Sequence, residues 1–87
     1  MHTKNRDFFA LTNEHKAILQ QFLQHNNQSL SAADLHGFTN IEPIKISAII
    51  ADLVAHDMIY KTNADAHEDK WLYKLSEEGL KLTVKNP

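Results

Sequence analysis

The sequence predicts a mainly α-helical domain with one small β-hairpin, in the order α-α-α-β-β-α. Apolar residues recur at helical spacing in three stretches that precede residue 57. Two short aromatic and β-branched segments, 58–62 and 70–75, flank a polar stretch, which is typical of a hairpin. Ser76 and the two glutamates after it then offer a cap and an acidic first turn for a last helix, which should end near residue 84.

Length and composition favour one compact module without a separate catalytic cleft. The chain has 87 residues, no cysteine and a formal net charge of −2. We expect a single domain over 1–87, with its core at about 11–84 and a flexible N-terminus at 1–7. Without cysteine, neither a disulfide nor a thiolate zinc site can form. No apolar run is long enough to cross a membrane, and a cytoplasmic location is the expectation.

The first helix is expected from residue 12 to about residue 24. Apolar residues recur there at helical spacing, and polar side chains occupy the opposite side. Thr12 or Asn13 can cap the start of this helix. The run 26–28 is poor in helix formers and marks its end.

The second and third helices are delimited by capping residues and by proline. Ser31 can cap a second helix, with the Asp34 carboxylate reaching back as in a capping box. Gly37 stands where a left-handed residue would end that helix. Pro43 suits the first position of a third helix, which should end near His56.

The order and spacing of these elements resemble the winged helix-turn-helix transcription regulators, especially those of the MarR type. That family has a Leu closing its second helix, an apolar residue early in the third, then a Leu and a Gly-Leu-Ile sequence before the wing. The matching positions here are Leu35, Ile46, Leu53 and 57–59. Segment 71–80 is similar to the family's second wing strand and to the Leu-Thr-x-x-Gly-x-x-Leu start of its next helix. The resemblance covers roughly 11–82 and implies a winged helix-turn-helix fold.

The resemblance also implies a sequence-specific, DNA-binding transcriptional regulator. Its third helix would enter the major groove of double-stranded DNA, and its β-wing would lie on the backbone. The expected DNA-binding residues are Ser31, Thr39, Lys45, Ser47, Lys61 and Lys70. The protein would act as a homodimer held by its terminal segments, through Leu80, Leu82, Val84 and the residues around Phe8 and Phe9.

An alternative interpretation is a winged-helix protein-interaction module with an acidic face that does not bind DNA. Six carboxylates lie between residues 42 and 69, against only Lys45 and Lys61, whereas a DNA-binding face should be positive. The family often carries Arg at the exposed start of the third helix. This chain has Pro43, Ile44, Lys45, Ser47 and Ala48 there. A protein partner therefore remains an open alternative to DNA.

The sequence carries no pattern typical of an enzyme or of a metal site. It lacks a Gly-x-Ser-x-Gly elbow and a glycine-rich phosphate loop. Its six histidines never have the spacing that places two of them on one helical turn. Trp71 and Tyr73 alternate on one strand face, which is more typical of a core face than of a base-stacking platform. We expect no catalytic residue, no metal and no cofactor.

Overall fold

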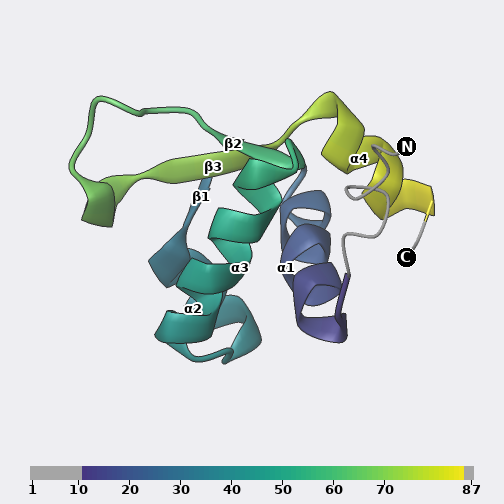
Figure 1. The fold of residues 1–87 in the computed structure, drawn as a ribbon, viewed down its shortest axis with the longest axis horizontal. Coiled ribbons are helices and arrows are strands. Elements are labelled where there is room, and N and C mark those ends of the chain that lie inside the picture. The colour runs from purple at the N-terminus through teal and green to yellow at the C-terminus, as the bar shows by residue number, and fades with distance from the viewer. Residues whose placement is uncertain (1–10, 86–87) are drawn as a thin grey trace, which may run out of the picture.

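The computed structural model describes residues 11–85, which form four α-helices and a three-stranded antiparallel sheet. The elements in chain order are α1 (Asn13–Gln24), β1 (Leu30–Ser31), α2 (Ala32–Thr39), α3 (Pro43–Ala55), β2 (Ile59–Lys61), the 3₁₀ turn η2 (Glu68–Lys70), β3 (Leu72–Leu75) and α4 (Glu77–Lys85). This confirms a mainly α fold with a β-wing, 59–75. The wing projects from one side of the helices, and α4 packs beside α1 on the other (Figure 1). The expected flexible segment 1–7 and the expected dimer contact at Phe8 and Phe9 lie outside the described residues.

The sheet contains one strand that the sequence pattern did not predict. In β1, Leu30 lies opposite Tyr73 of β3, and on the other side of β3 Ile59 of β2 lies opposite Leu75. The strand order is β1-β3-β2. The predicted order α-α-α-β-β-α lacked β1 because two residues are too few to show the alternation of a strand. The extra strand ties the start of α2 to the wing.

The end of α2 corrects a second prediction. Its start is as expected, because the Ser31 hydroxyl accepts from the Asp34 N–H and the Asp34 carboxylate from the Ser31 N–H, both at 3.0 Å. Gly37, however, lies inside the helix, and Asn40 is the left-handed residue, with a φ of 62°. Asparagine tolerates this conformation, and its N–H donates to the His36 carbonyl at 2.8 Å to close the last turn.

The helices α1 and α3 begin and end close to the expected residues. The Thr12 hydroxyl accepts from the His15 N–H at 3.2 Å and so caps α1. Pro43 is the first residue of α3, where a missing N–H costs nothing. Asp57, two residues beyond the end of α3, has a φ of 59° and turns the chain towards β2.

The core lies where α1, α2, α3 and the sheet meet. Its buried apolar residues are Ile18, Leu19, Phe22, Leu30, Leu35, Ile46, Ile49, Ile50, Leu53, Ile59, Tyr73 and Leu75. Leu35, Ile46 and Leu53, three of the positions that carried the family resemblance, are fully buried. Among the described residues, no helix combines the length and the apolar character that crossing a membrane requires.

Candidate nucleic-acid interface

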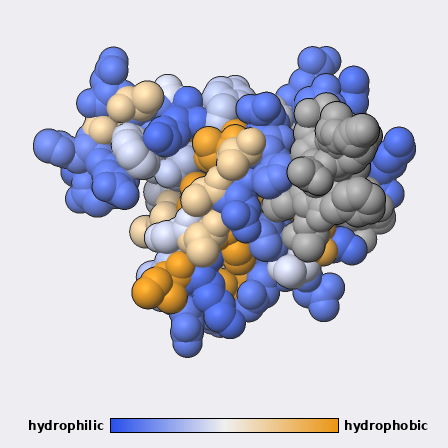
Figure 2. Space-filling view, viewed as in Figure 1, coloured by the Kyte–Doolittle hydropathy of each residue, from blue (hydrophilic) through white to orange (hydrophobic). Residues whose placement is uncertain are grey.

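The helix α3 leaves one apolar face uncovered. Ile44, Ala48, Ala51 and Ala55 are all exposed and, at this spacing, share one side of the helix, which we name the outward face of α3. Ile44 is 79% exposed. In the space-filling view an apolar band follows α3 across the front of the molecule (Figure 2). The core lies on the opposite side of the helix, so the outward face of α3 is accessible to a partner.

The charged side chains of α3 are turned towards α1 instead. Lys45 Nζ lies 3.6 Å from Glu14 Oε2, and Asp52 Oδ2 lies 3.2 Å from His15 Nε2. The His15 ring is buried, and its Nδ1 lies 2.6 Å from the Thr12 hydroxyl. Asp52, one of the carboxylates that argued against DNA in the sequence, therefore does not lie on the outward face. The Lys45 pair is solvent-exposed, so little free energy is lost when Lys45 turns to another anion.

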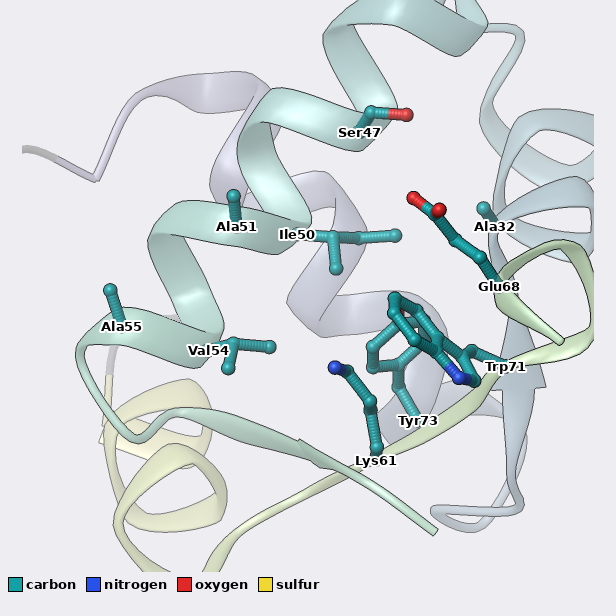
Figure 3. A pocket seen from close by; sticks show the side chains of 10 residues that line it. All are labelled: Ala32, Ser47, Ile50, Ala51, Val54, Ala55, Lys61, Glu68, Trp71 and Tyr73. Atoms are coloured by element: carbon teal, nitrogen blue, oxygen red, sulfur yellow. The ribbon is translucent and has the colours of Figure 1, made fainter. Parts of the chain in front are cut away.

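A groove of about 410 Å³ separates α3 from the wing (Figure 3). We name it the α3–wing groove, and its lining residues are Ala32, Ser47, Ile50, Ala51, Val54, Ala55, Lys61, Glu68, Trp71 and Tyr73. Most of the lining is apolar. Its ionisable side chains are Lys61, Tyr73 and Glu68, whose carboxylate points across the groove towards α3 in Figure 3. The groove therefore carries one cation and one anion on the wing side.

Aromatic residues hold the wing side of the groove in place. Lys61 Nζ lies 3.6 Å from the centroid of the Trp71 ring, a cation–π contact. The Trp71 indole N–H donates to the Ala66 carbonyl at 3.0 Å. Burial, and secondarily the charge of Glu68, raises the pKa of the Tyr73 phenol, which therefore stays protonated at neutral pH.

The wing tip is bonded internally through Asn63. The side-chain amide of Asn63 donates to the Lys70 carbonyl at 3.0 Å and accepts from the Leu72 N–H at 2.7 Å. The Ala66 N–H donates to the Asn63 carbonyl at 2.9 Å. These bonds tie the segment after β2 to the end of η2 and to the start of β3. The Lys70 side chain is exposed. The sequence indicated only a polar, flexible tip, and its mobility stays a prediction.

The six residues expected to bind DNA are spread over α2, α3 and the wing. Ser47 and Lys61 line the α3–wing groove, Lys70 lies at the wing tip, and Lys45 lies on the α1 side of α3. Ser31 caps α2 at the end nearest the wing. The Thr39 hydroxyl donates to the Leu35 carbonyl at 2.7 Å and accepts from the Ile41 N–H at 3.2 Å, so its proton is already used.

Sequence reasoning missed Glu68 as a groove residue. Glu68 belongs to η2, and no local sequence pattern predicts that this 3₁₀ turn places a side chain in the α3–wing groove. The exposure of Ile44 had a signal, because the residue departs from the helical spacing of the buried Ile46, Ile49 and Ile50. Among residues 11–85, no three histidine, aspartate or glutamate side chains are grouped as metal ligands would be.

Comparison with known proteins places this arrangement in a family. Residues 11–79 match the family described as winged helix DNA-binding domain. Three similar solved structures are the adhesin competence repressor AdcR from Streptococcus pyogenes (27% identity, TM-score 0.73, 88% of this chain and 54% of that one), a MepR–DNA complex from Staphylococcus aureus (21%, 0.74, 91% and 58%) and Staphylococcus aureus MarR with salicylate and kanamycin (17%, 0.70, 80% and 45%).

These comparisons agree with the fold and with the MarR-type spacing of the sequence. The chain spans about half the length of the solved structures it matches. No curated protein sequence gives a significant match. The matched family is described as a DNA-binding domain, AdcR is described as a repressor, and MepR is described as a transcription regulator. With most of its length matched by one family model, the chain belongs to the winged helix DNA-binding domain family.

Proposed function

We propose that the chain is a sequence-specific transcriptional regulator that inserts α3 into the major groove of double-stranded DNA and lays its wing on the backbone. The observation that carries this proposal is the uncovered outward face of α3, flanked by a wing that bears Lys61 and Lys70. A helix free along one side is what the major groove admits. The fold that the chain shares with DNA-bound MepR supports the same placement. Such a function corresponds to a cytoplasmic location.

The lysines supply the electrostatic part of this binding. Lys70 is exposed at the wing tip, and Lys61 is held over Trp71 at the groove. Lys45 exchanges its contact with Glu14 for a phosphate, at little cost because the pair is exposed. Ser31 still has a hydroxyl proton for a phosphate oxygen, and Ser47 faces the groove. Thr39 contributes least, because its proton is donated within α2.

The salt dependence of binding to a random-sequence duplex tests this proposal. Changing Lys45 and Lys70 to alanine should remove two phosphate contacts and flatten the plot of log K against log salt by about two units. The matched control changes the exposed Lys81 and Lys85 of α4 to alanine and should leave the slope unaltered. A wild-type chain that binds no duplex at low salt, where electrostatic attraction is strongest, contradicts the proposal.

One observation favours a second candidate function, a protein-interaction module. The outward face of α3 carries no charged group, and Ile44 is among the most exposed large apolar residues of the described chain. Such faces are typical of contacts between proteins as well. With the Glu68 carboxylate in the α3–wing groove, this surface also suits a partner protein with basic and apolar groups. Failure to bind any duplex, with the fold intact, would favour this candidate.

A further inference from the structure

The exposed start of α3 is the part of a winged helix that contacts base edges. After Pro43, the exposed side chains of its first two turns are Ile44, Lys45, Ser47 and Ala48. Lys45 points to Glu14, and Ser47 lines the α3–wing groove. Ile44 and Ala48 therefore occupy the centre of the contact. Neither side chain donates or accepts a hydrogen bond, so the usual polar recognition of bases is missing at this position.

Ile44 is well suited to a fixed apolar contact. It is 79% exposed, so the core does not require it. As a β-branched residue in a helix it keeps one preferred side-chain orientation. Ala48 lies one turn further along the same face, and the small side chains of Ala51 and Ala55 continue it. The helix can therefore approach a surface closely along its whole outward face.

Only one of the four bases presents a methyl group in the major groove, and this decides what such a face can recognise. Thymine carries its C5 methyl group there, whereas the other bases present donors and acceptors but no methyl group. A donor or acceptor pressed against Ile44 loses its water partner without a replacement. A thymine methyl gains free energy from the same contact.

On the basis of the DNA-binding function proposed above, we infer that Ile44 and Ala48 select DNA sites in which thymine methyl groups lie under the first two turns of α3. The lysines are excluded from this role by their positions. Lys61 and Lys70 belong to the wing, and contacts to phosphates position a protein without identifying bases. The preference for a DNA sequence then depends on methyl contacts and on any hydrogen bond that the Ser47 hydroxyl makes from the α3–wing groove.

The test compares duplexes that differ only in methyl groups. The full chain is titrated with an alternating adenine–thymine duplex of about 20 base pairs and with the same duplex in which uracil replaces every thymine. We expect the thymine duplex to bind tighter by roughly fourfold for each contacted methyl group. An alternating guanine–cytosine duplex should likewise gain affinity when 5-methylcytosine replaces cytosine, because that methyl lies in the same groove.

Two variants connect the effect to α3. The change Ile44→Ala should bring the ratio of thymine to uracil affinities towards one, while the exposed position leaves the fold intact. The control Lys70→Ala should weaken binding to both duplexes equally and keep the ratio. Equal wild-type affinity for the two duplexes overturns the inference but leaves DNA binding standing. Binding to neither duplex at low salt overturns both proposals, and the outward face is then a protein contact.

Discussion

Two glycines with opposite surroundings give the clearest prediction at the scale of the residue. A Cβ at Gly79 would overlap the carbonyl oxygen of Met58, because the first turn of α4 packs directly on the backbone that enters β2. At Gly37, inside α2, an added Cβ meets nothing within 4 Å. We expect Gly79→Ala to lower the free energy of unfolding by about 1–3 kcal/mol or more, and Gly37→Ala to raise it by up to about 1 kcal/mol. Urea unfolding measures both, and equal effects would contradict the packing of α4 on Met58.

Tyr73 links stability to alkaline pH. Its pKa is raised above the usual value of about 10 by burial first and by Glu68 second, so folding favours the neutral phenol. The contribution of the neutral phenol to the free energy of unfolding is fully present below a pH of about 10. It is lost as the pH rises through the pKa of Tyr73 in the folded protein. We expect Tyr73→Phe to reduce this alkaline loss of stability in urea titrations, and Tyr60→Phe, at an exposed position, to leave it unchanged. Identical curves for wild type and Tyr73→Phe would show that the phenol does not contribute.

At the scale of the element, we expect the 3₁₀ turn η2 to weaken the proposed DNA binding through one side chain, Glu68. The Glu68 carboxylate lines the α3–wing groove, where a phosphate backbone passes between helix and wing if the proposed function holds. Replacing it by glutamine should raise the affinity for a duplex by roughly two- to fivefold at low salt, the effect of removing one partly exposed like charge. Glu77→Gln on α4 is the matched control and should change nothing. An unchanged affinity of Glu68→Gln would mean that the backbone does not approach the groove.

The sequence predicted the elements better than it predicted their faces. Caps at Thr12 and Ser31 and the proline at the start of α3 are local signals, so most helix ends were correct. The predicted end of α2 at Gly37 was wrong because glycine can end a helix but need not do so. Asn40 is the left-handed residue that ends α2. The sequence did not predict strand β1, because its two residues are recognisable as a strand only through their pairing with β3.

The candidate site was predicted less completely because its side chains depend on tertiary neighbours. Lys45 was expected at the DNA, and its pairing with Glu14 follows only once α1 is packed beside α3. The same packing removes Asp52 from the outward face through its contact with His15. The number of carboxylates between residues 42 and 69 therefore overstated the negative charge on the outward face of α3. A count of residues in the sequence does not show which way each side chain points.

At the scale of the whole molecule, we propose a single domain that acts as a homodimer through α4. One winged helix covers only a few base pairs, and two copies recognise a longer site. Leu80 and Val84 are 38% and 61% exposed and lie one turn apart on α4, where they form an apolar surface for a second copy. This end of the molecule lies away from the wing (Figure 1). A dimer through α4 thus leaves both copies of α3 free.

The change Val84→Asp should therefore give a monomer by light scattering and weaken duplex binding, while the fold survives because the residue is exposed. Ile44→Asp is the matched control, since it places the same charge on an equally apolar but distant surface. That variant should remain dimeric and lose duplex binding through repulsion of phosphates at α3. The two substitutions separate assembly from recognition. A wild-type chain that is monomeric at high micromolar concentration would contradict the dimer, and binding to a single half-site would then be the most that this chain achieves alone.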